Sequence, residues 1–200
     1  MRWLILDFDN VISPTHYWFD ASLGEVAKER SLNTRKAVLF LCRHMPQWFR
    51  NTWNTSTTLD RMGRHLHQTV PLRLFREKLK GTLRPQPEVL RAVAALRKRG
   101  VKVAVLTDSP AIRIRLMRTL LKGQFDHITG SGFLGHMKRD RRCFRKLCAR
   151  LRAKPEDCLL VDDLELNCAS ARKAGLQALR FSIAERPARE LAARLRSLRE

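Results

Sequence analysis

Three short apolar runs, each of which stops at polar residues, constrain the fold of this chain more than any other feature. The runs are Trp3–Leu6, Val101–Leu106 and Cys158–Val161. Short continuous apolar runs are typical of strands that are buried on both faces of a parallel sheet. The first run meets acid at Asp7, the second ends at Thr107, and the third is followed by Asp162 and Asp163. We therefore expect three buried strands whose ends carry polar side chains.

Helical patterns lie between and after these runs. One helical face is formed by Val89–Leu96, and Gly100 stands where a C-terminal cap belongs. After the second strand, Ser109 is expected to cap a helix that has Pro110 at its first position and Gly123 at its end. The alternation of strands and helices predicts an α/β fold with a Rossmann-like parallel sheet as its core.

The same alternation continues to the end of the chain. Apolar spacing predicts helices over Phe144–Leu151 and around Ala171–Gly175, and Leu176–Phe181 is a weaker strand candidate. The segment from 186 to 200 is expected to form a terminal amphipathic helix. Its apolar face would consist of Leu191, Leu195 and Leu198.

The stretch from residue 14 to residue 82 has a different character. It is rich in Trp, Phe, His and Arg, has helix-like apolar spacing, and contains no obvious strand run. We interpret it as a small inserted helical subdomain. Residues 1–13 and 83–200 would then form the α/β core.

The net charge of the chain is its least ordinary property. Forty Lys and Arg against nineteen Asp and Glu give a formal charge of +21. Such a field concentrates phosphorylated substrates and also holds nucleic acid without sequence preference. Arginines spread over solvated helix faces are the alternative interpretation, and charge alone does not decide between them.

Cysteine spacing and the length of the first apolar run indicate the cellular compartment in which the protein is expected. Five cysteines without a Cys-x-x-Cys pair indicate neither a disulfide framework nor a zinc site, which favours core thiols in a reducing compartment. The first run is too short for a signal peptide or a membrane span. We expect a cytoplasmic protein with no membrane contact, and the oligomeric state stays open.

In a parallel sheet the residues that follow the strands meet at one edge, where ligands bind. The first such segment reads LILDFDNVI and resembles the DxDx(T/V) motif of the haloacid dehalogenase (HAD) superfamily. This resemblance implies that Asp7 attacks phosphorus to give an aspartyl-phosphate, while Asp9 protonates the leaving oxygen and later activates water. An acid at the position of Asp9 favours phosphoryl transfer, because relatives that dehalogenate lack it.

The second and third HAD motifs supply groups for the phosphate. The segment VKVAVLTDSP is similar to the second motif, so Thr107 is expected to bind phosphoryl oxygens through its hydroxyl and backbone amide. Asp108 follows at a phosphate-binding position, where many relatives carry Asn and where a carboxylate would repel the substrate. Lys138 resembles the third-motif lysine, which neutralises the nucleophile and the phosphoryl group, although Arg139 and Arg141 replace the prolines common in relatives.

The fourth motif is matched by CLLVDDLELN in its DDxxxN form. The resemblance implies a Mg²⁺ site formed by Asp7, the backbone carbonyl of Asp9 and Asp163, with assistance from Asp162. Asn167 is expected to orient Lys138 or an acid rather than to bind metal.

The inserted segment stands where relatives carry a helical cap of the C1 type, which covers the active site and selects substrates. Its candidate substrate contacts, for which a core role is the alternative, are Trp18, Arg43, Trp48, Trp53, His65 and His67. The leading hypothesis is a magnesium-dependent phosphatase for a small phosphate monoester. The alternatives are a phosphatase for phosphorylated macromolecules or nucleic-acid ends, and a catalytically weak binding protein with a HAD fold.

Overall fold

The sheet has the parallel architecture that the apolar runs predict. The structure, a computed structural model, describes residues 1–15 and 18–197. In these residues five parallel strands form one sheet in the order β3-β2-β1-β4-β5. The strands are β1 (Trp3–Leu6), β2 (Lys102–Thr107), β3 (His127–Gly130), β4 (Cys158–Asp162) and β5 (Gln177–Arg180). The predicted Rossmann-like α/β fold is thereby confirmed.

The strand register explains why the polar residues meet. Leu6 at the end of β1 lies beside Val105 of β2 on one side and Val161 of β4 on the other. The next residue, Asp7, donates its backbone amide to the carbonyl of Val161 at 2.9 Å. Because the three strands end at the same level, their terminal side chains share one edge of the sheet.

Helices cover both faces of the sheet, and alternate strand residues face opposite layers. Leu4 and Leu6 pack into one apolar cluster, whereas Trp3 and Ile5 belong to another. The helices of the first layer are α5 (Pro87–Lys98), α6 (Ala111–Leu120) and α10 (Ala188–Ser197), and those of the second are α7 (Ser131–Leu134), α8 (Arg141–Leu151) and α9 (Glu165–Lys173). Strands buried on both faces account for the continuous apolar runs in the sequence.

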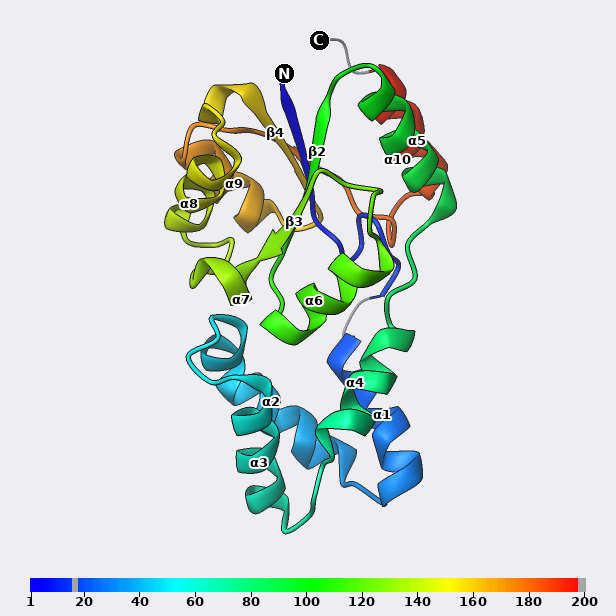
Figure 1. Cartoon of the computed structure of the whole chain (residues 1–200), viewed down its shortest axis with the longest axis vertical. Helices are drawn as coiled ribbons and strands as arrows, with labels where there is room; N and C mark the ends of the chain where they lie inside the picture. Colours follow the sequence, from blue (N-terminus) through cyan, green and yellow to red (C-terminus); the bar gives the residue numbers. More distant parts are fainter. Residues whose placement is uncertain (16–17, 198–200) are drawn as a thin grey trace.

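Four further helices form a lobe of their own between β1 and α5. They are α1 (Trp18–Arg30), α2 (Thr34–Phe49), α3 (Thr55–Leu66) and α4 (Leu72–Gly81). Their buried face is a separate apolar cluster that includes Trp48, Phe49 and Phe75. In Figure 1, β1 starts at the far end of the molecule and runs towards this helical lobe. The division of the chain at residues 14–82 into core and cap stays a prediction.

Several local features differ from the sequence predictions. The strand β3 is an addition, because its four residues, HITG, are too few and too polar to give an apolar run. The predicted cap at Ser109 is wrong: α6 begins at Ala111, and Pro110 is its N-cap with no side-chain capping bond. The hydroxyl of Ser109 instead contacts Thr107 and an arginine of α6. The predicted contact of Leu198 lies outside the described residues.

None of the helices in the described part of the chain is long and apolar enough to cross a membrane. Four of the five cysteines are buried free thiols, and Cys42 is exposed.

Candidate active site

A buried lysine joins the ends of two neighbouring strands. Lys138, in the loop before α8, places its ammonium 2.6 Å from a carboxylate oxygen of Asp7 and 2.6 Å from one of Asp162. Only 2% of the lysine side chain is exposed. A cation this deeply buried needs compensating charge, which the two strand-end carboxylates supply. The fold therefore brings together the residues predicted from the first, third and fourth HAD motifs, namely Asp7, Lys138 and Asp162.

Asp162 acts as the support of this lysine. One of its carboxylate oxygens accepts from Lys138, and the other accepts from the amide of Leu164 at 3.0 Å and from Nδ2 of Asn167 at 2.9 Å. Both oxygens are thus engaged by protein donors, and the side chain is fully buried. Asn167 orients an acid, as its position in the sequence suggested.

Three carboxylates lie close enough for one cation. Ligand atoms of Asp7, Asp162 and Asp163 all lie within 4.8 Å of one another. Asp7 and Asp163 line a cavity at this edge of the sheet, whereas Asp162 does not. Hard carboxylate oxygens suit Mg²⁺, and three carboxylates exceed the single charge of Lys138, so these residues fit a divalent cation. Asp7 and Asp163 are therefore better placed than Asp162 to reach a cation in the cavity, and the assisting role of Asp162 at a metal stays a prediction.

Burial and mutual repulsion leave a clear mark on this acidic cluster. Burial, together with the neighbouring carboxylates of Asp162, Asp9 and Asp163, raises the pKa of Asp7 well above its ordinary value despite the opposing charge of Lys138. Burial also raises the pKa of Asp163. A bound divalent cation would reverse both shifts, because it favours the ionised carboxylates.

Asp9 is held by an arginine that the sequence reasoning missed. Arg113 of α6 donates from its two terminal nitrogens to the two carboxylate oxygens of Asp9, both at 2.7 Å. The arginine side chain is 0% exposed, and its guanidinium lies 4.6 Å from the ring centre of Trp18 and 5.3 Å from that of Phe8. The available signal was helical spacing, since Arg113 shares a buried face with Met117.

A chain of hydroxyl groups connects this arginine to the second motif. Arg113 also donates to Oγ of Ser109 at 3.0 Å, and that hydroxyl lies 3.0 Å from Oγ1 of Thr107. The end of β3 packs tightly against β2 here, because a Cβ on Gly130 would lie 2.0 Å from the carbonyl oxygen of Thr107. Glycine at this position lets two strand ends approach, which fixes the position of Thr107.

Asp108 braces the loop that carries the lysine. Its carboxylate oxygens accept from the backbone amide of Lys138 at 3.1 and 3.2 Å. Burial raises the pKa of Asp108 to about 6, against the opposing effects of Lys138. A direct role in phosphate binding stays a prediction for this residue.

A cavity of about 370 Å³ lies between the sheet edge and the helical lobe. Its sheet side carries Asp7, Asp9, Thr107 and Lys138, and its lobe side carries aromatic and Met side chains that include Trp18. The predicted strand-end residues therefore open onto one shared space.

The haloacid dehalogenase-like hydrolase family matches residues 1–175. The chain belongs to this family. A curated relative is acyl-CoA dehydrogenase family member 10 of Mus musculus, 29% identical over 110 residues. That match covers 54% of this chain and 10% of the relative, so the chain spans about a tenth of the mouse protein.

Solved structures of other HAD proteins share the fold. A HAD family enzyme from Bacteroides thetaiotaomicron superposes with a TM-score of 0.75 at 14% identity, covering 90% of this chain and 93% of that one. A predicted HAD-like hydrolase from Porphyromonas gingivalis gives 0.72 at 17% identity and covers 99% of both chains. The L-2-haloacid dehalogenase of Xanthobacter autotrophicus gives 0.63 at 14% identity, with 90% and 77% covered. At these identities the likeness shows the fold alone.

The candidate cap contacts of this HAD hydrolase occupy different places in the lobe. Trp18 lines the central cavity, whereas Trp48 is buried in the lobe. Trp53 and His65 lie against two rings of α2 in tilted arrangements, Trp53 beside His44 and His65 beside Phe40. The remaining two, Arg43 and His67, are exposed and do not line the cavity.

Proposed function

We propose that this HAD hydrolase is a magnesium-dependent phosphatase that hydrolyses a phosphate monoester through an aspartyl-phosphate on Asp7. The observation that carries the proposal is the presence of two carboxylates, Asp7 and Asp9, on one cavity beside the buried ammonium of Lys138. A nucleophile and a separate acid are what phosphoryl transfer to water requires. The second acid distinguishes this chemistry from dehalogenation in the same family.

In the first step, a carboxylate oxygen of Asp7 bonds to phosphorus while the bond from phosphorus to the leaving oxygen breaks. Asp9 gives that oxygen its proton. In the second step, Asp9 takes a proton from water, the water oxygen bonds to phosphorus, and the bond to Asp7 breaks to release phosphate. Lys138 balances the negative charge that gathers on Asp7 and the phosphoryl oxygens.

The residues of the acidic cluster fit a magnesium ion. Magnesium, when bound, would neutralise phosphoryl oxygens and reduce their repulsion by Asp7. The Bacteroides thetaiotaomicron enzyme has been crystallised with magnesium and inorganic phosphate, which supports the proposal for the shared fold.

Arg113 sets a condition on the acid–base step. Both oxygens of Asp9 accept from the guanidinium in this structure. Proton transfer therefore requires one oxygen of Asp9 to turn from Arg113 towards the cavity and to take up a proton there before the leaving oxygen departs. We expect substrate binding beneath Trp18 to accompany this rotation, because the indole ring contacts the same guanidinium.

The test is hydrolysis of p-nitrophenyl phosphate by the purified protein with magnesium. Asp7→Asn should lower kcat by about a thousandfold or more, because it removes the nucleophile. Asp60→Asn, which changes an exposed acid of α3, should leave kcat unchanged. Removing magnesium with a chelator should abolish turnover by the wild type.

Equal inactivity of the wild type and Asp7→Asn towards this ester would contradict the proposal and favour the binding-protein alternative. Acid quenching during turnover should trap phosphate on the wild-type protein. Asp7→Asn should trap none.

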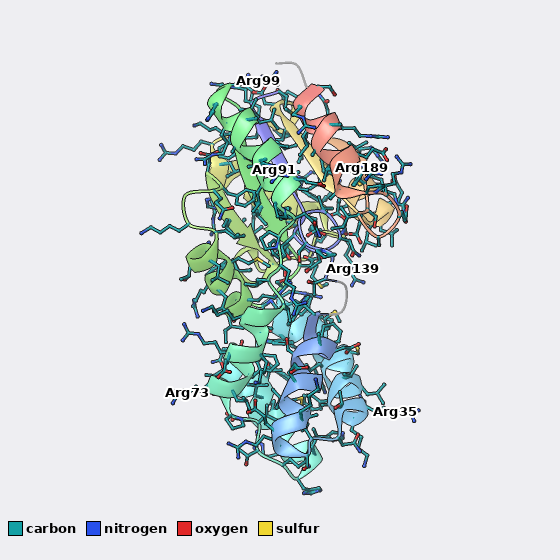
Figure 2. The ribbon with its side chains drawn as sticks, turned by 90° about the vertical axis from the view of Figure 1, so that its right-hand side faces the viewer. Arg35, Arg73, Arg91, Arg99, Arg139 and Arg189 are labelled. Carbon is teal, nitrogen blue, oxygen red and sulfur yellow. The ribbon has the colours of Figure 1, made fainter. Side chains whose placement is uncertain are left out.

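A nucleic-acid partner stays a prediction. Figure 2 shows the labelled arginines spaced along the molecule, from Arg99 at one end to Arg35 and Arg73 on the helical lobe. Arg139 lies near the junction of the two lobes and also lines the cavity. The labelled arginines thus lie on both the α/β core and the helical lobe.

A further inference from the structure

The cavity has two chemically different halves. Its polar lining residues are accounted for by the phosphoryl centre. Asp7, Asp9, Thr107, Lys138 and Asp163 belong to the proposed chemistry. The two other polar groups of the floor are already engaged, since Asp108 accepts from the amide of Lys138 and Asn167 donates to Asp162.

The rest of the described lining is apolar except for Arg139. The helical lobe contributes Trp18, Phe19, Met45 and Phe49. The rings of Trp18 and Phe49 are stacked, with centres 5.8 Å apart and planes 17° apart. Burial on the lobe side, together with the guanidinium over the indole ring, holds this apolar wall in place.

The core side adds apolar side chains that are costly to leave in water. Met137 precedes Lys138, and Leu164 and Leu166 follow the carboxylate of Asp163. Leu164 is 51% exposed and Leu166 is 79% exposed. Single exposed leucines are common, but two beside a catalytic cavity mark a surface that an apolar ligand can cover.

We propose, on the basis of the proposed phosphatase function, that the substrate phosphate carries an uncharged apolar group, aryl or short alkyl, rather than a polyhydroxyl sugar. The cavity volume of about 370 Å³ suits one ring or a short chain. Sugar hydroxyl groups placed against Trp18, Met45 and Phe49 would lose water without gaining acceptors, which disfavours their binding. Arg139 is exposed and offers donors only.

The experiment compares two non-hydrolysable ligands of equal length, butylphosphonate and 3,4-dihydroxybutylphosphonate, by calorimetric titration with magnesium present. We expect butylphosphonate to bind at least about tenfold more tightly, since two hydroxyls must be desolvated in its analogue. Lengthening the ligand from methyl- to butylphosphonate should raise affinity about twofold to fourfold for each methylene. Equal or tighter binding of the dihydroxy ligand would overturn the inference.

A variant of an apolar lining residue tests whether the apolar surface causes the preference for butylphosphonate. Leu166→Gln should weaken butylphosphonate binding about fivefold and leave binding of inorganic phosphate unchanged, because it alters only the cavity mouth. Leu39→Gln is the matched control, since Leu39 is 60% exposed on α2 and does not line the cavity. Equal effects of the two variants would also overturn the inference.

Turnover separates this inference from the function on which it rests. If butyl phosphate is hydrolysed and discrimination is absent, the phosphatase proposal stands and the apolar pocket fails. If butylphosphonate is preferred and no phosphate ester is hydrolysed, the apolar pocket is supported and the phosphatase proposal fails.

Discussion

Two buried cations, Lys138 and Arg113, hold the two carboxylates that are proposed to do the chemistry, and they do so in opposite ways. Lys138 shares one charge between Asp7 and Asp162, with Asp163 close by. Arg113 pairs its planar fork with one carboxylate, that of Asp9, and also donates to the hydroxyl of Ser109. The lysine centre is therefore short of positive charge, whereas the arginine pair is electrically complete.

The difference indicates what each centre is built to receive. Burial by itself lowers the pKa of Lys138, but Asp162 and Asp7 outweigh it and raise that pKa well above its usual range. The ammonium therefore stays charged, and the surplus carboxylate charge can bind a divalent cation. The arginine centre instead meets the helical lobe through Trp18, so it connects Asp9, the proposed acid–base residue, to that lobe.

Removing the lysine should give the largest effect. We expect Lys138→Met to lower kcat by about a thousandfold and the free energy of unfolding by about 3–5 kcal/mol, because the buried carboxylates of Asp7 and Asp162 lose the cation that pairs with both of them. Urea unfolding and p-nitrophenyl phosphate turnover measure the two effects. Magnesium should restore part of the stability and none of the turnover.

Lys122→Met, at an exposed position after α6, is the control and should behave as the wild type. Unchanged unfolding of Lys138→Met without magnesium would show that the lysine centre is not charge-deficient.

Breaking the arginine pair should have a smaller effect on catalysis. Arg113→Met should lower the free energy of unfolding by about 2–3 kcal/mol, because Asp9 retains partial contact with water. We expect kcat to fall about tenfold to a hundredfold with little change in KM, since Arg113 positions Asp9 but does not line the cavity.

Arg113→Lys separates charge from geometry at the same site. It keeps the positive charge and loses the fork, so it should recover stability more than kcat. A rise in KM without a fall in kcat for either variant would contradict a positioning role and point to direct substrate contact.

The same comparison shows which features the sequence predicts. The lysine centre follows from pattern, because apolar runs end at Asp7 and Asp162 and a motif places Lys138 between them. Arg113 carries no such mark in a chain of forty basic residues, although its helical spacing places it on a buried face. Its partner lies 104 positions away, and only the packed fold brings the two together.

The apolar half of the cavity is hidden for a related reason. Leu164 and Leu166 look like ordinary helix-entry residues, since sequence alone does not reveal which leucines stay exposed. The contribution of the lobe depends on how α1 and α2 meet the sheet edge. Periodicity predicts helices in that segment but not which of their side chains face Asp7.

The smallest effect should come from Asp108, a further carboxyl group beside Lys138. The pKa of Asp108 is raised to about 6 by burial, against an ordinary value of 3.8. A carboxyl whose pKa is higher in the folded state adds stability below about pH 4, and this is lost as pH rises through 6. Asp108→Asn should therefore match the wild type near pH 4 and be more stable by about 1–2 kcal/mol at pH 7.5.

Asp126→Asn provides a control of opposite sign. Partial burial raises the pKa of Asp126, but hydrogen bonds from Arg97 and Val103 outweigh this and lower it. That carboxylate adds stability at neutral pH that is lost on acidification, so Asp126→Asn should be less stable than the wild type at pH 7.5 and closer to it near pH 3. Urea unfolding of both variants at a series of pH values measures how the free energy of unfolding of each one changes with pH. If Asp108→Asn, like Asp126→Asn, were less stable than the wild type at pH 7.5, Asp108 would be a stabilising ion-pair partner of Lys138 rather than surplus negative charge.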